Sequence, residues 1–116
     1  MSKRVLFVCA GNLDRSPTAE QLYSKTPGLE VRSAGTSDLA RTVITEDEVD
    51  WAVVIFVMER KMIRLLRRRL GDALKEKELI CLSIPDDYQF MQAELLESLT
   101  AKLTPYLGPP VTVNHG

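Results

Sequence analysis

The sequence predicts an α/β fold built on a parallel β-sheet. Short apolar runs alternate along the chain with segments of helical periodicity, an alternation typical of strand–helix–strand units. The runs at 5–8, 52–57 and 79–82 are apolar throughout, as expected for strands that helices cover on both faces. The 116 residues suffice for one domain, which we assign to residues 1–107, with 108–116 as a C-terminal tail.

The first half of the chain contains two strands and one helix. After the strand at 5–8, Ser16 is the expected N-cap of a helix and Pro17 its first helical residue. That helix ends near 26–28, where Thr, Pro and Gly follow one another. Residues 29–32 alternate apolar and charged side chains, which indicates an exposed edge strand.

The second half adds three helices and two strands. Thr45, with Glu48 three residues later, predicts a capping box for a short helix. The segment 59–70 carries its apolar residues on one side and ends at Gly71. A last helix is expected to end before Pro105, and its apolar positions are Met91, Leu95, Leu99 and Leu103.

Composition excludes several classes of protein. Apolar residues make up 45% and charged residues 27%, so the chain can bury a core and stay in solution. No apolar run approaches the ~20 residues that a membrane span needs, and only four apolar residues precede Cys9, too few for a secretory signal. The 16 acids and 15 bases nearly balance. We therefore expect a cytoplasmic protein that binds neither membrane nor nucleic acid.

The turn between the first strand and the first helix is the segment most informative about function. This segment, residues 9–16, is called the anion loop below. Ligands of open α/β sheets bind at the carboxyl ends of strands, and successive N–H groups beside a helix N-terminus form an anion site. Gly11 and Asn12 tolerate the left-handed backbone of such a turn. Cys9 starts the loop, where the same donors stabilise a thiolate, and Arg15 can bind two phosphoryl oxygens.

The cysteine and histidine counts limit the chemistry. Cys9 and Cys81 are the two cysteines, and the one histidine, His115, lies in the tail. A Cys–His pair, a four-thiolate metal site and a disulfide framework are therefore excluded. The anion loop itself must activate Cys9, with Ser16 placed to hydrogen-bond the thiolate. We expect Cys81 to be buried in its strand, and we expect no metal or cofactor.

The anion loop resembles the signature of the low-molecular-weight protein tyrosine phosphatase family, Cys-x5-Arg-Ser after a first strand. Two further elements agree with that family: Ser33-Ala34-Gly35-Thr36 after the second strand and Asp86-Asp87-Tyr88 after the last. The resemblance covers roughly residues 4–107. It implies the phosphatase I-like fold, a three-layer αβα domain with a four-stranded parallel sheet in the order 2-1-3-4.

The resemblance also implies the chemistry, hydrolysis of a phosphate monoester through a phosphocysteine. Cys9 would be the nucleophile, Arg15 would bind the phosphoryl group and Asp86 would be the general acid. Asn12 would maintain the shape of the loop through Ser16 and Ser33. Tyr88 and Leu13 would form the walls of the substrate slot, and Asp87 stands where the family has proline. The residues implied in phosphate or substrate binding are Ala10, Gly11, Asn12, Leu13, Asp14, Ser16 and Tyr88, supported by Ser33 and Asp87.

Three departures from the family leave the substrate open. Asp14 replaces a second cysteine, and we expect its carboxylate to point outward, because an inward carboxylate would repel a phosphoryl dianion. The segment between Thr36 and Thr45 is too short for the helix and substrate-shaping loop of typical members. Val53 replaces an acid. Phosphotyrosine on a protein is the default substrate, with phosphoarginine or a small phosphate ester as alternatives.

Two other functions and one surface remain to be weighed. A thiol-dependent arsenate reductase on this fold would need a pair of resolving cysteines, and a non-catalytic phosphate or phosphoprotein binder would need only the anion loop. The helix within 59–70 carries six bases and no acid after Glu59: Arg60, Lys61, Arg64, Arg67, Arg68 and Arg69. These bases form either a solvated face or a docking patch for an acidic partner.

Overall fold

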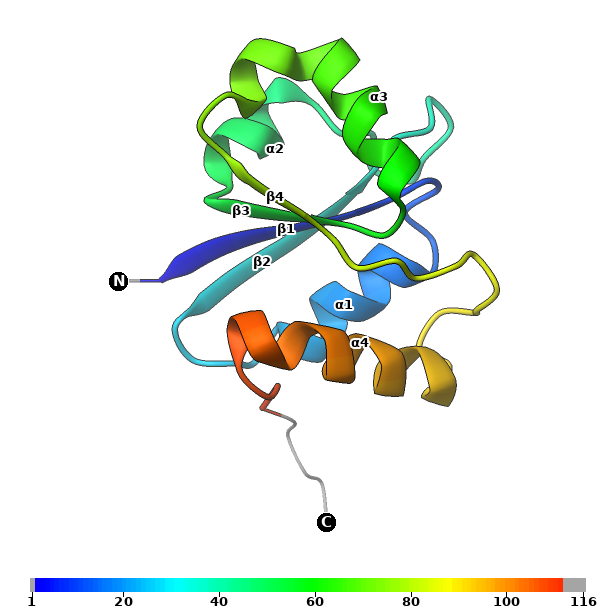
Figure 1. Ribbon diagram of the computed structural model, residues 1–116. Helices are drawn as coiled ribbons and strands as arrows, with labels where there is room; N and C mark the ends of the chain where they lie inside the picture. Colours follow the sequence, from blue (N-terminus) through cyan, green and yellow to red (C-terminus); the bar gives the residue numbers. More distant parts are fainter. Residues whose placement is uncertain (1, 112–116) are drawn as a thin grey trace.

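The chain forms a three-layer αβα sandwich around one parallel sheet (Figure 1). The computed structural model describes residues 2–111, so His115 lies outside the described residues. The sheet contains four strands in the order β2-β1-β3-β4, which confirms the predicted fold class and strand order. Their bounds are β1 Lys3–Cys9, β2 Leu29–Gly35, β3 Val54–Val57 and β4 Glu78–Cys81.

Helices cover both faces of the sheet. Figure 1 shows α1 (Arg15–Tyr23) and α4 (Ala93–Leu107) on one face. The helices α2 (Glu46–Trp51) and α3 (Arg60–Leu70), with the 3₁₀ turn η1 (Gly71–Leu74), lie on the other. The central strands β1 and β3 are therefore buried on both sides, whereas β2 alternates between exposed and half-buried positions at its start and lies at an edge, as predicted.

Several local predictions are confirmed by the structure. The capping box forms at the start of α2, where Glu48 accepts the backbone N–H of Thr45 at 2.9 Å. The helix α3 ends at Leu70, immediately before Gly71. The boundary between domain and tail stays a prediction, and Gly108, the first residue of that tail, accepts a hydrogen bond from Tyr23 Oη at 2.9 Å.

The prediction that Ser16 caps α1 is wrong. The helix begins two residues earlier, at Arg15 instead of Pro17, with Asp14 at the cap position and no hydrogen bond from a capping side chain. Ser16 lies inside the helix and is fully buried. Its hydroxyl lies 3.0 Å from Cys9 Sγ. The hydroxyl therefore contacts the side chains of Cys9 and Asn12, and not the backbone N–H groups at the start of the helix as a capping residue would.

The predicted limits of the last helix are also wrong at both ends. Met91 lies before α4 with a φ of 62°, and the helix continues through Pro105 to Leu107. Proline costs the helix one N–H donor and crowds the preceding turn. Near the end of a helix this cost is outweighed, because Leu103 is buried and Leu107 packs against the core. Gly108 then closes the helix by donating to the Thr104 carbonyl at 2.9 Å.

Cys81 is half-buried rather than buried. It ends β4, which lies at the edge of the sheet and has no fully buried position. The apolar run of this strand predicted coverage on both faces, but an edge strand lacks a neighbour on one side.

Candidate active site

The carboxyl ends of the strands assemble one site. Cys9 ends β1 beside Gly35 at the end of β2, Glu59 follows β3 closely, and the chain after β4 brings Asp86 to the same edge. Parallel strands place these ends together, as in other open α/β sheets. The ends surround a cavity of about 100 Å³, lined by Cys9, Gly11, Leu13, Asp14, Arg15 and Asp86.

The anion loop curls so that its N–H groups stay unpaired. Asn12 adopts a left-handed φ of 54°. The carbonyls of Cys9, Ala10 and Gly11 turn outward and accept the N–H groups of Thr36, Ser37 and Arg41 at 2.9, 3.0 and 3.1 Å. Within residues 2–111, the backbone N–H groups of 11–14 donate to no protein acceptor. Together with the N-terminus of α1, they form the anion site that the sequence predicts.

The loop after β2 supports this curl from outside. A Cβ atom on Gly35 would lie 2.5 Å from the Ala10 carbonyl oxygen and 2.5 Å from the Ala40 Cβ, so only glycine allows the two segments to approach. Arg41 adds a side-chain contact, since its Nε donates to the Asn12 carbonyl oxygen at 3.2 Å. Sequence reasoning missed Arg41, because a single base in a short loop carries no signal.

A chain of buried polar contacts leads to the thiol. Ser33 Oγ donates to Glu20 Oε1 at 2.6 Å and accepts a proton of Asn12 Nδ2 at 2.9 Å. The same Asn12 nitrogen donates to Ser16 Oγ, also at 2.9 Å. The Ser16 hydroxyl can therefore donate a hydrogen bond either to Cys9 Sγ at 3.0 Å or to the more distant Ala34 carbonyl oxygen at 3.4 Å. Cys9 Sγ is the nearer of the two groups, so this chain of contacts holds the Ser16 hydroxyl against the thiol group.

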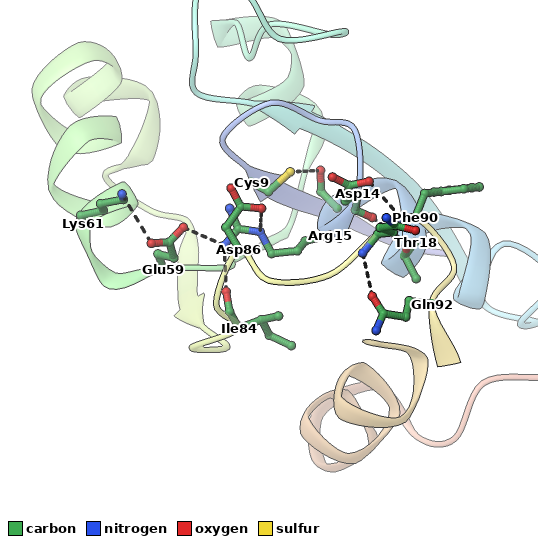
Figure 2. A network of polar contacts seen from close by, with 12 residues as sticks. Cys9, Asp14, Arg15, Thr18, Glu59, Lys61, Ile84, Asp86, Phe90 and Gln92 are labelled. Atoms are coloured by element: carbon green, nitrogen blue, oxygen red, sulfur yellow. Dashed lines mark hydrogen bonds and ion pairs between the residues drawn. The ribbon is translucent and has the colours of Figure 1, made fainter. Parts of the chain in front are cut away.

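Arg15 is held rigidly beside the thiol. Only 1% of the residue is exposed, and its Nη1 donates to Glu59 Oε1 at 2.7 Å and to the Ile84 carbonyl at 2.8 Å (Figure 2). Burial by itself would raise the pKa of Glu59, but the hydrogen bond and charge of Arg15, together with Lys61, hold that pKa below its ordinary value. Glu59 therefore stays ionised and orients the guanidinium.

Glu59 is a residue of the candidate site that sequence reasoning missed. The available signal was its position, an acid that follows a buried strand at the edge of the sheet where ligands bind. Sequence alone does not reveal its partner, because 44 residues separate it from Arg15.

The three residues of the Asp-Asp-Tyr element take different positions. Asp86 lines the cavity, and its Oδ1 lies 3.6 Å from Arg15 Nε. Asp87 is exposed and outside the cavity lining. Tyr88 is half-buried against the core and does not line the cavity either. Leu13, 62% exposed, lies at the rim.

Asp14 joins the anion loop to the segment that carries Asp86, residues 85–91, called the acid loop below. Asp14 Oδ1 accepts the backbone N–H of Phe90 at 2.9 Å (Figure 2). Thr18 Oγ1 accepts the backbone N–H of Met91, also at 2.9 Å. The carboxylate of Asp14 thus accepts a hydrogen bond from the acid loop at the cavity rim, and its orientation away from a bound phosphoryl group stays a prediction. Because it accepts this hydrogen bond, the negatively charged carboxylate of Asp14 lies against the backbone of the acid loop.

Neither a metal site nor a membrane span is found in the described part of the chain. Within residues 2–111, no three His, Cys, Asp or Glu side chains gather in a way that could hold a metal ion. No helix there has the length and apolar character needed to cross a bilayer.

Comparison with known proteins identifies the family. Residues 4–65 match the model of the low molecular weight phosphotyrosine protein phosphatases. The protein-arginine-phosphatase of Geobacillus stearothermophilus is 28% identical over 125 residues, which cover 97% of this chain and 84% of that protein.

Two solved structures share the fold. The phosphate complex of the tyrosine phosphatase Wzb from Escherichia coli K30 has a TM-score of 0.75 at 20% identity, over 92% of this chain and 97% of that one. The low molecular weight protein tyrosine phosphatase SP-PTP from Streptococcus pyogenes has a TM-score of 0.71 at 18% identity, over 90% of this chain and 93% of that one. The resemblance noted in the sequence is thereby confirmed: the chain belongs to the low molecular weight phosphotyrosine protein phosphatase family, whose members hydrolyse phosphoric monoesters.

Proposed function

We propose that this phosphatase acts on phosphorylated proteins through a phosphocysteine on Cys9, with Arg15 binding the phosphoryl group and Asp86 as general acid. One observation carries the proposal. The thiol, the buried guanidinium and the carboxyl group line one cavity of about 100 Å³ beneath the unpaired N–H groups of the anion loop.

In the first step, Cys9 Sγ attacks phosphorus and the bond from phosphorus to the leaving oxygen breaks. Asp86 gives its proton to that oxygen, so the leaving group departs as an alcohol or phenol. The N–H groups of 11–14 and the Arg15 guanidinium bind the three equatorial oxygens, whose charge is spread in the transition state. Ala10 belongs to the same anion loop, and Leu13 lies at the rim of the cavity.

In the second step, a water molecule attacks the phosphocysteine. Asp86, now a carboxylate, takes a proton from the water, and the S–P bond breaks to release inorganic phosphate. The hydroxyl of Ser16 stabilises the departing thiolate, and Asn12 and Ser33 hold that hydroxyl in place. The enzyme returns with Cys9 as thiolate and Asp86 protonated.

The leaving group is the part of the substrate that the site specifies least. Phosphotyrosine follows from the family, whereas the Geobacillus relative is named for phosphoarginine, and a small phosphate ester would fit too. Tyr88 would flank a phenyl ring only if it moved from its half-buried position, while exposed Leu13 lies ready at the rim. We further propose that residues 1–107 carry the whole activity and that it takes place in the cytoplasm, where thiols stay reduced.

The test is turnover of an aryl phosphate, a phosphotyrosine peptide and a phosphoarginine peptide by the wild type and by Cys9→Ser. The wild type should release phosphate from at least one of them. Cys9→Ser should lose at least ~10⁴ of that rate, because a hydroxyl without a base is a poor nucleophile. Phosphate should protect Cys9 from alkylation by iodoacetamide. Turnover that survives in Cys9→Ser would contradict the mechanism.

A non-catalytic phosphate or phosphoprotein binder is the second candidate. The observation in its favour is the 66% exposed side chain of Asp86, which leaves the acid without a buried environment. Phosphate binding without turnover of any ester would support it. The arsenate reductase alternative has less support, since Cys81 lies on β4, at the edge of the sheet two strands away from β1.

A further inference from the structure

A groove of about 530 Å³ lies next to the active-site cavity, between α3 and the ends of β1 and β2. Ala10 and Thr36 form its wall on the side of the anion loop. Ala10 sits between Cys9 and Gly11, which line the catalytic cavity, so the groove adjoins the place where the phosphoryl group binds. From α3 come the apolar Met62 and Leu65 together with Arg60, Lys61, Arg64 and Arg68. These eight residues define the basic groove.

The lining of the basic groove contains four cations and no acid, although Arg68 also lines a neighbouring cavity with Glu46 and Asp72. All four are exposed, and α3 contains no acid. Within residues 2–111, Lys61 pairs with Glu59 at 3.5 Å, while Arg60, Arg64 and Arg68 form no ion pair. The whole chain carries a net charge of −1. The positive charge is thus a local feature, not a property of the composition.

The spacing of the arginines suits an extended peptide. Arg60, Arg64 and Arg68 repeat every four residues and so follow one side of α3. At 1.5 Å per residue they span about 12 Å, which corresponds to about four residues of extended chain. The apolar floor of Met62 and Leu65 can take up the aliphatic part of side chains that lie across it.

We propose that the basic groove binds acidic residues of the substrate protein that flank its phosphorylated residue. The inference rests on the proposed function, since it takes the phosphorylated residue to occupy the neighbouring cavity. Single-stranded nucleic acid suits the groove less well, because its lining holds no aromatic side chain on which a base could stack. An acidic peptide supplies carboxylates for the cations and needs no stacking surface.

The test measures binding and turnover of three phosphotyrosine peptides whose four flanking residues are all Glu, all Gln or all Lys. Binding is followed by fluorescence anisotropy with Cys9→Ser, which does not consume the peptide. At low ionic strength the Glu peptide should bind about tenfold more tightly than the Gln peptide, from two ion pairs of about threefold each. The order should be Glu, Gln, Lys, and added salt should reduce the differences. On the wild type, kcat/KM should follow the same order.

A matched pair of double variants locates the effect. Arg64→Gln/Arg68→Gln removes two charges from the groove, whereas Lys25→Gln/Lys75→Gln removes two exposed charges outside its lining. The ratio of Glu-peptide to Gln-peptide affinity should fall to nearly one in the first variant and stay near ten in the second. This ratio cancels any loss common to both peptides, including partial unfolding.

Four outcomes would overturn the groove inference. They are equal affinity for the Glu and Gln peptides, equal loss in both double variants, and stronger competition by a poly-uridine oligonucleotide or by anionic lipid vesicles than by the Glu peptide. If the wild type hydrolyses no phosphate compound at all, the proposed function fails. The anisotropy series would still decide whether the groove selects acidic flanks.

Discussion

The anion loop and the acid loop supply the two halves of the candidate site, and the chain holds them in opposite ways. In the anion loop, Asn12, Arg15 and Ser16 are at most 1% exposed. In the acid loop, Asp86, Asp87 and four of their neighbours are exposed. The anion loop is fixed by buried or partly buried hydrogen bonds from Cys9 to Ser16 and from Arg15 to Glu59. The acid loop is attached to α1 and its cap by one hydrogen bond each to Asp14 and Thr18, and by the longer Asp86–Arg15 ion pair at 3.6 Å.

This difference follows from what each half must do. Phosphoryl oxygens are bound by donors that already point the right way, so a rigid, buried loop loses little by reorganising. On the proposed mechanism, the acid would approach leaving groups of different size and exchange protons with water, which an exposed loop permits. Changes in the first half should therefore affect stability and activity together, and changes in the second half should affect mainly the step that involves the leaving group.

The largest effect tests the acid loop itself. Asp86→Asn should lose ~10² to 10⁴ in rate on phosphotyrosine, whose phenolate leaves poorly without a proton. It should lose far less on an ester of a strongly acidic phenol, and its melting temperature should stay close to that of the wild type. Asp87→Asn, its exposed neighbour, is the matched control and should be mild on both esters. If Asp87→Asn alone shows the loss that depends on the leaving group, the roles of the two acids are swapped.

The next effect tests the buried half through Glu59. Glu59→Gln removes the charge that orients Arg15, and we expect a loss of about 10- to 100-fold in kcat/KM together with a lower melting temperature, because a buried arginine loses its partner. Lys61→Gln is the control, because it removes only the exposed ion pair between Lys61 and Glu59 and keeps the pair between Arg15 and Glu59. Unchanged stability in Glu59→Gln would show that the ion pair is not structural.

The pKa of Glu59 adds a pH signature to this comparison. A carboxyl group whose pKa is lowered by folding stabilises the fold above its unfolded pKa, and this contribution is lost as pH falls through the folded pKa. The gap in melting temperature between wild type and Glu59→Gln should therefore be full near pH 7 and close as pH falls below about 4, under the ordinary glutamate range. A gap that widens in acid would contradict the assigned direction.

The smallest effect tests the bond that joins the two halves. Asp14→Ala removes the acceptor for the Phe90 N–H, so the acid loop should be less well positioned. We expect a loss of about 3- to 10-fold, which corresponds to one hydrogen bond of ordinary net strength, about 0.7–1.4 kcal/mol, and mainly on esters with poor leaving groups. Asp14→Asn keeps an acceptor oxygen and should stay closer to the wild type. Equal losses on good and poor leaving groups would place the role of Asp14 in phosphate binding instead.

Sequence reasoning predicted the fold well where local patterns decide it. Three apolar runs located β1, β3 and β4, because strands covered by helices must be apolar on both faces. The alternating segment at 29–32 located the edge strand β2, and the succession of strands and helices predicted a parallel sheet. The position of the anion loop followed from Cys9 at the end of one such run and Arg15 six residues later. Periodicity did not determine the helix ends. At the start of α1, the contact of Ser16 with Cys9 outweighs the local preference of Ser16 for a cap position. At the end of α4, the packing of Leu107 against the core outweighs the cost of Pro105.

The amino-acid sequence by itself determined which groups are available: one thiol beside a helix start, one arginine to bind oxygens, adjacent acids after the last strand and a helix of bases. Only the tertiary structure decided how they combine. It paired Arg15 with Glu59 across 44 residues and Asp14 with Phe90 across 76, brought Asp86 rather than Asp87 to the cavity and placed the basic groove against the anion loop. The reason is physical: the order of strands in a sheet brings distant segments together at one edge, and no local spacing in the chain encodes which side chains meet there.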